Sequence, residues 1–310
     1  MEKKIKITVI MSTYNGEKYL REQLDSILAQ DINEWGILKI LVRDDGSSDD
    51  TVKILEEYKI STKGQLDYYT GENLRTAGSF WNLVNRVGEA DYYSFSDQDD
   101  VWFKDKLSRA VKKLESMGDG PLLYCSEYTA VDSNMKQLDI VHDELNKFTD
   151  FPHSLLYSTA PGCTFVFNEA ARREMVKYDM GRYFPEIHDW LAHRIITMTG
   201  RMYFDETPSM YYRQHGDNVI GMQSGGIKGL KRRIKMFLSG STESIRARCA
   251  GNLLKIYGDE LDTDRREILR EVACYRKNSA YRKKFLKDKR FCPGGINTLF
   301  LKFLIITKRI

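Results

Sequence analysis

Residues 92–102 read Tyr-Tyr-Ser-Phe-Ser-Asp-Gln-Asp-Asp-Val-Trp, an aromatic run that ends in three carboxylates within four positions. We interpret the run as a buried strand that ends just before Asp97, Asp99 and Asp100. Carboxylates this close repel one another, and burial beside a core adds a desolvation cost. A cation would remove both penalties, and Mg²⁺ or Mn²⁺ prefers carboxylate oxygens. The stretch therefore predicts a metal site at the carboxyl end of a strand, where open α/β sheets bind ligands, although a solvated acidic turn before a helix is the alternative.

The rest of the N-terminal half alternates between strand and helix patterns. Strands are predicted at residues 5–12, 37–42, 65–69 and 92–96. Helices are predicted at residues 17–30 and 79–87. Two further helices are indicated by apolar residues at helical spacing, which are Val52, Leu55 and Tyr58 in one and Leu107, Val111 and Leu114 in the other. We predict that Ser47 or Ser48 caps the second helix. This β-α-β-α order with short connections implies an α/β fold, in which helices cover both faces of a parallel sheet.

Polar loops lie near the ends of the four predicted strands. They are Thr13-Tyr14, Asp44-Asp45, Asn73–Arg75 and Asp97–Asp99. Because the carboxyl ends of parallel strands share one edge of a sheet, we expect these loops to gather there. An aspartate after the second strand suits a base or a ribose, and a nearby arginine suits a phosphate. The absence of G-x-G-x-x-G after the first strand argues against a dinucleotide site, and the absence of G-x-x-x-x-G-K-[ST] excludes a P-loop.

The middle of the chain, residues 122–219, carries fewer local signals. Strands are predicted at 122–125 and 159–167, and helices at 168–178 and from 187 to about 199. Asp189 falls in the first turn or at the N-cap of the last helix, where a capping carboxylate is the alternative to a functional one. Residues 211–219 are predicted to form a polar, aromatic loop that carries His215, for which a surface or core histidine is the alternative to a ligand.

Composition places the chain among globular proteins. Of its 310 residues, 42% are hydrophobic and 30% are charged, which is enough to bury a core. Neither a signal peptide nor a membrane-spanning run is predicted. Five scattered cysteines, with no C-x-x-C pair, are typical of reduced thiols in the cytoplasm.

Charge is distributed unevenly along the chain. Residues 225–310 hold 22 Lys and Arg against 8 Asp and Glu, a net +14, so that residues 1–224 carry −10. We therefore expect an acidic body at residues 1–224 and a basic, mainly helical extension at 225–310. A basic extension suits nucleic acid, an anionic membrane or a solvated helical face, and no recognised nucleic-acid module accompanies it.

Two segments of the extension combine basic and apolar residues. Residues 227–238 alternate them at helical spacing, and the apolar run 299–306 is accompanied by Lys302, Lys308 and Arg309. Both segments suit the surface of an anionic bilayer. The alternative is a helical extension that packs against the body and keeps a solvated basic face. A homodimer formed through this extension also stays open.

Seven short motifs in sequence order resemble those of one enzyme family. They are Val-Ile-Met-Ser-Thr-Tyr-Asn-Gly at 9–16, Val-Arg-Asp-Asp-Gly-Ser-Ser-Asp-Asp-Thr at 42–51, residues 73–82, Ser-Asp-Gln-Asp-Asp-Val-Trp at 96–102, Gly-Cys-Thr at 162–164, His-Asp-Trp at 188–190 and Tyr-Arg-Gln-His-Gly-Asp-Asn at 212–218. Over about residues 5–220 the chain resembles the inverting family 2 glycosyltransferases with the GT-A fold. It looks most like their bacterial rhamnosyltransferase branch.

The resemblance implies a role for each candidate residue. Thr13, Tyr14 and Asp45 would hold the base and ribose of a nucleotide sugar, and Arg75 would contact the base or the diphosphate. Asp97 would contact the ribose or the metal, and Asp99 and His215 would bind the Mg²⁺ or Mn²⁺ together with the diphosphate. Asp189 would be the general base.

The resemblance also implies substrates and a location. The donor would be dTDP-β-L-rhamnose, and the acceptor would be a hydroxyl of a growing cell-surface glycan or lipid-linked saccharide. The protein would be cytoplasmic, with peripheral attachment to the inner face of the cell membrane. A UDP-hexose or UDP-N-acetylhexosamine donor is the first alternative, and a non-catalytic sugar-nucleotide or glycan-binding protein is the second.

Overall fold

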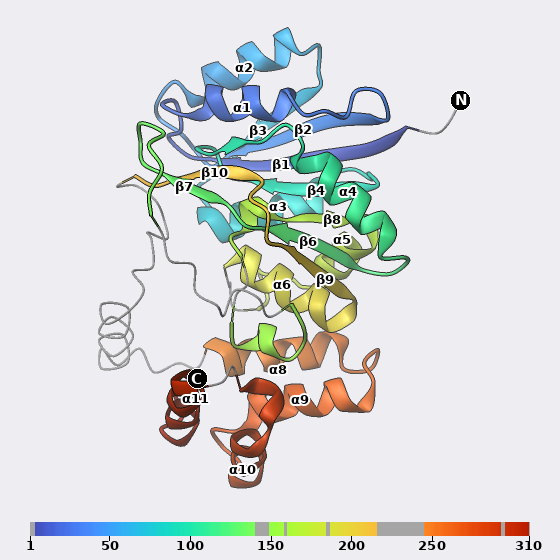
Figure 1. The fold of residues 1–310 in the computed structure, drawn as a ribbon, viewed down its shortest axis with the longest axis vertical. Coiled ribbons are helices and arrows are strands. Elements are labelled where there is room, and N and C mark those ends of the chain that lie inside the picture. Colours follow the sequence, from blue (N-terminus) through green and yellow to red (C-terminus); the bar gives the residue numbers. More distant parts are fainter. Residues whose placement is uncertain are drawn as a thin grey trace.

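The structure, a computed structural model, describes residues 4–139, 149–157, 160–183, 187–215, 245–292 and 295–309. In these residues a seven-stranded main sheet has the order β3-β2-β1-β4-β8-β6-β9 (Figure 1). Its strands are β1 (Ile5–Thr13), β2 (Gly36–Asp44), β3 (Leu66–Thr70), β4 (Tyr92–Ser96), β6 (Leu122–Ser126), β8 (Val166–Asn168) and β9 (Arg201–Asp205). The first four strands pair in parallel, as the alternating pattern predicts, and so do β6 and β9. The predicted α/β fold class is confirmed.

The strand β8 differs from the one predicted at residues 159–167. It is antiparallel to both of its neighbours, β4 and β6, and it begins only at Val166. The residues before it form a 3-10 turn at Gly162–Thr164, in which the Phe165 N–H donates to the carbonyl of Gly162 at 2.8 Å. The β-propensity of the stretch therefore gives way to a turn.

A second, three-stranded sheet lies beside the carboxyl edge of the main sheet (Figure 1). It consists of β5 (Val101–Trp102), β10 (Met210–Arg213) and β7 (Thr129–Val131). The prediction of a loop at residues 211–219 is wrong for its first residues, because Tyr211 lies in a strand and pairs with both Val101 and Thr129. Residues 216–219 lie outside the described part of the chain.

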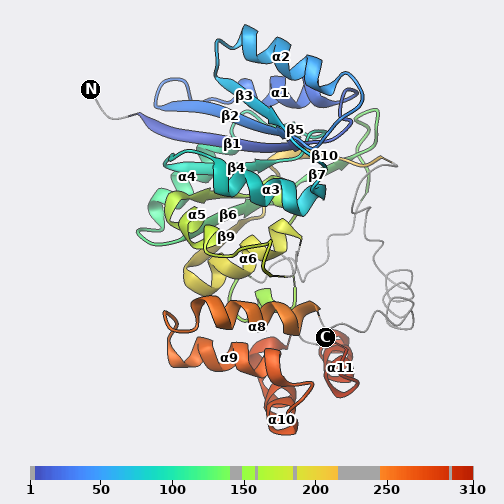
Figure 2. The same cartoon turned by 180° about the vertical axis from the view of Figure 1, so that it is seen from behind.

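Helices cover both faces of the main sheet (Figures 1 and 2). They are α1 (Leu20–Leu28), α2 (Thr51–Ser61), α3 (Arg75–Arg86), α4 (Lys106–Ser116), α5 (Glu169–Val176) and α6 (His188–Thr199). The helices α1, α2 and α4 share a core with Val9 and Met11 of β1. The helices α3, α5 and α6 share the opposite core with Ile10 of β1 and Phe95 of β4. Alternate residues of a strand point to opposite faces, so one buried apolar strand supplies both cores.

The C-terminal helices gather at the end of the molecule farthest from α2 (Figures 1 and 2). They are α8 (Ile245–Tyr257), α9 (Thr263–Cys274), α10 (Ser279–Lys287) and α11 (Gly295–Ile306). The first of them packs against the α5 side of the body, where the Tyr257 hydroxyl donates to the carbonyl of Glu174 at 2.8 Å. The predicted boundary between residues 224 and 225 and the predicted basic segment 227–238 lie outside the described residues. Among the described helices, none has the length and apolar character needed to cross a membrane.

Candidate active site

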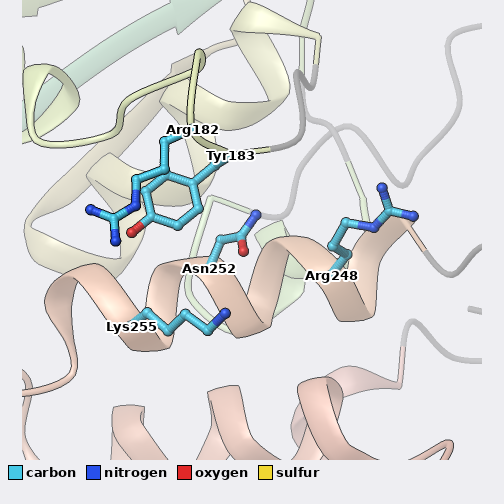
Figure 3. A pocket seen from close by; sticks show the side chains of 5 residues that line it. All are labelled: Arg182, Tyr183, Arg248, Asn252 and Lys255. Atoms are coloured by element: carbon cyan, nitrogen blue, oxygen red, sulfur yellow. The ribbon is translucent and has the colours of Figure 1, made fainter.

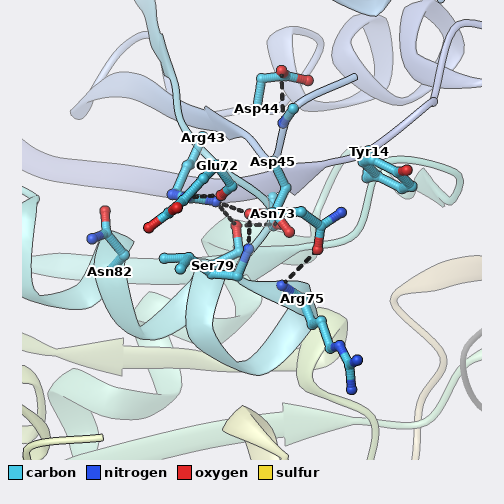
Figure 4. Close-up of polar contacts among 12 residues, drawn as sticks. Tyr14, Arg43, Asp44, Asp45, Glu72, Asn73, Arg75, Ser79 and Asn82 are labelled. Carbon is cyan, nitrogen blue, oxygen red and sulfur yellow. Dashed lines mark hydrogen bonds and ion pairs between the residues drawn. The ribbon is translucent and has the colours of Figure 1, made fainter. Parts of the chain in front are cut away.

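The ends of β1 and β2 are bonded side by side, and Asp45 lies directly after them (Figure 4). Its backbone N–H donates to the carbonyl of Thr13 at 2.8 Å. Its buried carboxylate accepts hydrogen bonds from Arg43, a buried β2 residue, and from the Leu74 N–H at 2.9 Å. Both contacts use Oδ1, whereas Oδ2 has no hydrogen-bond partner among the described residues. This oxygen is therefore available to accept a hydrogen bond from a ligand.

The serines after β2 do not cap α2 as predicted. The N-cap residue is Asp50, whose side chain makes no capping hydrogen bond. Ser47 Oγ donates to Asp44 and accepts from the Asn15 N–H at 2.9 Å. The Ser48 N–H donates to Asn15 Oδ1 at 2.8 Å. The serines therefore hold the loop after β2 against the loop after β1.

The predicted residues Tyr14 and Arg75 lie on different sides of this edge. The backbone of Tyr14 exchanges two hydrogen bonds with the Gln98 amide, at 2.9 and 3.1 Å, and the residue is 49% exposed. Arg75 begins α3 with a φ of 59°, and its N–H donates to Asn73 Oδ1 at 3.0 Å. Its guanidinium points away from Asp45 (Figure 4). The edge thus brings Thr13, Tyr14 and Asp45 together, but not the Arg75 guanidinium.

Asp97 lies at the centre of a group of carboxylates beyond β4. Burial, together with the nearby charges of Asp99 and Asp189, raises its pKa to about 7. Asp189 is far from Asp97 in the sequence, so the fold brings these carboxylates close enough for their charges to interact. The structure therefore brings three of the predicted site residues together.

Asp99 is paired with His215, the two residues that the resemblance assigns to the metal. The His215 Nε2 atom lies 2.7 Å from Asp99 Oδ2. The His215 ring packs against the ring of Tyr19 with centroids 5.1 Å apart. Arg213 Nε donates to the Asp99 carbonyl at 2.8 Å, which fixes the loop that carries this carboxylate. Both partners stay partly accessible, so a substrate can reach them.

Asp100, Cys163 and Lys106 form a layer beneath this surface to which the sequence analysis gave no function. Asp100 is buried, and burial raises its pKa well above the ordinary range, with the charges of Asp99 and Asp97 adding to the rise. Lys106 is also buried, and its Nζ donates to the Cys163 carbonyl at 2.9 Å. Burial lowers the pKa of Lys106 to about 8. The charge of Asp100 acts on Lys106 in the opposite direction to burial, so the lysine lies close enough to this aspartate for their charges to attract.

Asp189 lies in the first turn of α6, one of the two positions that the sequence allowed. Its Oδ2 accepts from the Gly162 N–H at 3.1 Å and its Oδ1 from the Trp190 N–H at 2.7 Å. A Cβ at Gly162 would come within 2.9 Å of the Asp189 Cβ, so glycine is what allows the turn to approach. Burial raises the pKa of Asp189 to about 6. Such a carboxylate is ionised at neutral pH yet basic enough to take a proton.

A divalent cation fits this group of residues. Asp100 Oδ2 is buried without a hydrogen-bond partner in the described part of the chain, and the aspartates raise one another's pKa values. The unpartnered oxygen and the repulsion between the aspartates both cost free energy, and a cation would reduce each cost. One ligand atom each from Asp97, Asp100 and Cys163 lies within 4.8 Å of the others. Burial raises the pKa of the Cys163 thiol well above its usual range, so the oxygens are the ligands that suit Mg²⁺ or Mn²⁺.

The fold and the site define a glycosyltransferase of the GT-A type. Residues 8–177 match the model of Glycosyl transferase family 2. The chain belongs to this family.

Known relatives agree with this placement. The dTDP-rhamnosyl transferase RfbG of Shigella flexneri is 33% identical over 222 residues, which cover 68% of this chain and 73% of RfbG. The crystal structure of S. aureus TarS with UDP-GlcNAc has a TM-score of 0.57 at 20% identity, and covers 97% of this chain and 82% of that one. The mannosyltransferase PcManGT from Pyrobaculum calidifontis, in complex with GDP-Man and Mn²⁺, has a TM-score of 0.51 at 16% identity, with 99% and 81% covered.

Proposed function

We propose that this protein is an inverting sugar transferase whose general base is Asp189. The observation that carries the proposal is a buried carboxylate, held by two backbone N–H groups, whose charge reaches Asp97 at the carboxyl edge of the sheet. In the reaction the acceptor oxygen bonds to the anomeric carbon of the donor sugar and its proton passes to Asp189. The bond from that carbon to the diphosphate breaks, and its electron pair leaves with the nucleoside diphosphate. One base and no enzyme nucleophile give inversion.

The remaining predicted residues divide between the nucleotide and the diphosphate. We assign the base and ribose to Thr13, Tyr14 and Asp45, because Asp45 Oδ2 has no partner among the described residues and Tyr14 is half exposed. Asp99 and His215 would hold Mg²⁺ or Mn²⁺, with Asp97 beside them. When bound, the cation would neutralise charge on the leaving diphosphate.

Arg75 receives a more restricted role. Its guanidinium points away from Asp45, but it lies at the start of α3 and is exposed. We propose that it contacts the diphosphate or the base only after its side chain turns towards them.

The proposed donor is dTDP-β-L-rhamnose, and the product is then an α-rhamnoside on a cell-surface glycan. The support is the similarity to RfbG, which is named a dTDP-rhamnosyl transferase. A UDP-linked donor is the alternative, because the structural neighbour TarS is seen with UDP-GlcNAc. The acceptor is proposed to be a lipid-linked saccharide or a growing glycan.

Isothermal titration separates these donors. The titrants are dTDP-rhamnose, dTDP and UDP, each with and without Mn²⁺, and the proteins are the wild type and Asp99→Ala. We expect Mn²⁺-dependent binding of dTDP that the variant loses. A preference for UDP would replace the donor and keep the mechanism, whereas no nucleotide binding in any condition would contradict the proposed function.

We propose that the protein divides into a catalytic domain at residues 1–224 and a basic extension at 225–310 that attaches it to an anionic membrane. On α11, Leu299, Phe303 and Ile306 recur at helical spacing and are exposed. Lys302 and Lys308 are exposed on the same segment, and they complement anionic headgroups. Flotation with phosphatidylglycerol vesicles tests this attachment, and absence of binding at low salt would contradict it.

A further inference from the structure

The buried histidine His188 has no role in the function proposed above. It begins α6 directly before Asp189, and it is only 5% exposed. Neither of its ring nitrogens has a hydrogen-bond partner in the described part of the chain. A neutral imidazole carries one N–H donor and one acceptor nitrogen, so burying both without partners costs free energy. Two such groups on one ring indicate that the ring acquires a partner from outside the chain.

Three elements of the fold hold this imidazole in place. Its ring stacks on that of Phe80 in α3, with the centroids 4.0 Å apart, and lies nearly perpendicular to that of Phe95 in β4 at 5.1 Å. A Cβ at Gly162 would come within 2.8 Å of His188 Nε2 and 2.9 Å of the Asp189 Cβ. One glycine therefore packs against both the imidazole and the proposed base. The ring cannot turn towards another partner without disturbing this packing.

A depression of about 540 Å³ between α8 and the loop that precedes α6 is organised differently (Figure 3). The side chains of Arg182, Arg248 and Lys255 point apart around it, so they do not converge on one ligand. The two unpartnered nitrogens of His188 belong instead to a single ring that packing holds in one position.

The surroundings of the imidazole define the chemistry of its partner. Burial lowers the pKa of His188 to about 3, so the ring is uncharged at neutral pH and does not attract a phosphate as a cation would. An alcohol hydroxyl both donates and accepts hydrogen bonds, as the neutral ring does. The aromatic rings beside it suit the apolar C–H groups of a ligand that carries such hydroxyls. A sugar hydroxyl therefore fits this position better than a charged group does.

The reaction itself brings a sugar to this part of α6. As the base, Asp189 has to come within hydrogen-bond distance of the acceptor hydroxyl, yet it is only 7% exposed. The residues that cover the first turn of α6 must therefore move aside when the substrates bind. His188 lies in the same turn and packs against the same glycine, so the movement that opens Asp189 also opens the imidazole.

The elements around the ring place it on the donor side of Asp189. The strand β4 leads into Asp97, and α3 begins directly after Leu74, whose N–H donates to Asp45. Both elements thus carry residues proposed for the nucleotide and the diphosphate. Consecutive residues of a helix point about 100° apart, so His188 and Asp189 face different groups. If Asp189 faces the acceptor, His188 faces the donor sugar.

We propose that His188 forms a hydrogen bond with a hydroxyl of the donor sugar and so helps to determine which sugar the enzyme transfers. The inference rests on the proposed function, in which Asp189 is the base and a nucleotide sugar is the donor. The imidazole transfers no proton in this role. A sugar that lacks the contacted hydroxyl, or carries it on the opposite face, leaves the ring nitrogens unpaired and binds more weakly.

The test compares nucleotide sugars with the nucleoside diphosphates that lack the sugar. Isothermal titration with Mn²⁺ measures dTDP-rhamnose against dTDP and UDP-GlcNAc against UDP, and the pair that the wild type binds more tightly is the probe. His188→Phe keeps a ring that stacks on Phe80 and removes both nitrogens. We expect this variant to bind the nucleotide sugar about tenfold more weakly and the nucleoside diphosphate as the wild type does. The control His153→Phe, at a histidine with no proposed role, should bind both as the wild type does.

A second pair of variants keeps the test decisive if phenylalanine disturbs the fold. Glutamine and methionine are similar in length and volume, but only the glutamine amide both donates and accepts hydrogen bonds well. His188→Gln should therefore bind the nucleotide sugar several-fold more tightly than His188→Met, and both should bind the nucleoside diphosphate equally. Without ligand, His188→Phe should melt at or above the Tm of the wild type, because the nitrogens that it removes are unpaired.

The failure of this inference is distinguishable from that of the proposed function. Wild-type affinity of His188→Phe for the nucleotide sugar, or equal affinity of the Gln and Met variants, would show that the ring contacts no sugar. A lower Tm of unligated His188→Phe with unchanged binding of the nucleotide sugar would show that a bound water is the partner, and would also overturn the inference. Equal weakening of both ligands would reduce His188 to a packing residue. Failure of the wild type to bind any nucleotide would contradict the proposed function, and this inference with it.

Discussion

The carboxyl edge of the parallel strands and the C-terminal helices are both rich in charged residues, but they differ in how these charges are buried and paired. At the edge, Asp100 and Asp189 are buried with other carboxylates nearby. On the helices, Arg290 pairs with Asp264 at 2.8 Å, and both side chains are exposed. Exposed charges cost little and indicate little about function. Buried like charges destabilise the fold, so their presence indicates a ligand that offsets the cost.

Removing the proposed base should have the largest effect in the molecule. Asp189→Asn keeps the shape of the side chain but cannot take a proton, and transfer should fall by about 10²–10⁴-fold. Donor binding should stay near the wild-type value. The comparison is Asp259→Asn, an exposed carboxylate after α8, which should leave the rate unchanged. Steady-state kinetics and donor titration measure both, and a variant rate above a tenth of the wild type would show that another group accepts the proton.

Removing the carboxylate that pairs with His215 should have the next largest effect. Asp99→Asn takes away a negative charge proposed to face the cation, so transfer should fall about 100-fold. Mn²⁺ should no longer strengthen binding of the nucleoside diphosphate to this variant. Treatment of the wild type with a chelator should lower the rate to a similar extent, and Asp259→Asn should respond to Mn²⁺ as the wild type does. A wild-type rate indifferent to the chelator would exclude the proposed metal dependence.

The sequence predicted the edge of the sheet well because its signals are local. A strand of apolar residues ends in a polar loop within a few positions, so β1 to β4 and the approach of Asp97 to Asp99 follow from neighbours in the chain. The position of Asp189 in α6 follows from the helical pattern in whose first turn it lies. Only the resemblance, however, placed Asp189 beside Asp97, because no local pattern relates residues so far apart.

The parts that were missed depend on distant contacts. Lys106 looks like an ordinary residue of an amphipathic helix, and its burial follows from a bond to Cys163, which lies 57 positions away. Arg43 looks like an exposed residue of a strand, but Asp45 and the carbonyl of Glu72 hold it inside. A charged residue inside an apolar strand was the one available signal. The remaining contacts arise only when the chain folds.

The pH dependence of transfer should report the burial of Asp189. Burial raises its pKa to about 6, and only the ionised carboxylate can take a proton. The rate constant kcat should therefore rise with pH through about 6 and fall about tenfold for each unit below it. A pH profile for the complex with donor and acceptor measures this, with Asp259→Asn as a control of unchanged profile. A rate that is constant between pH 5 and 7 would contradict the role of Asp189.

The attachment to membranes should depend on the apolar surface of α11 and not on exposed apolar residues in general. Leu299 is 67% exposed, and Ile60 on α2, at the opposite end of the molecule, is 69% exposed. Leu299→Glu should weaken flotation with anionic vesicles several-fold, because it removes apolar area and adds a repelled charge. Ile60→Glu should leave flotation unchanged. Equal loss in both variants would show that net charge governs binding and that α11 has no special part.

The smallest expected effect is on the free energy of unfolding. Replacing a buried carboxylate at the carboxyl edge of the sheet should stabilise the protein at high pH, whereas replacing a capping carboxylate of the C-terminal helices should destabilise it. Without metal, burial and the neighbouring charges raise the pKa of Asp97 to about 7, whereas an unfolded aspartate titrates near about 4. The folded state then binds more protons between these values, so the free energy of unfolding falls as pH rises through this window. An asparagine at position 97 does not ionise, so the variant keeps the free energy of unfolding that the wild type loses as pH rises. Asp97→Asn should therefore melt above the wild type at pH 8, and the difference should vanish near pH 4.

The opposite sign is expected for a carboxylate of the C-terminal helices. Asp262 caps α9 by accepting from the Arg265 N–H at 2.8 Å, and Asp262→Ala should cost about 1 kcal/mol. For a chain of this size that lowers Tm by about 2–4 °C. Thermal unfolding in chelator at pH 5 and pH 8 measures both variants. If Asp97→Asn melts below the wild type at pH 8, the carboxylates stabilise the fold without a ligand, and the contrast that identifies the active site is lost.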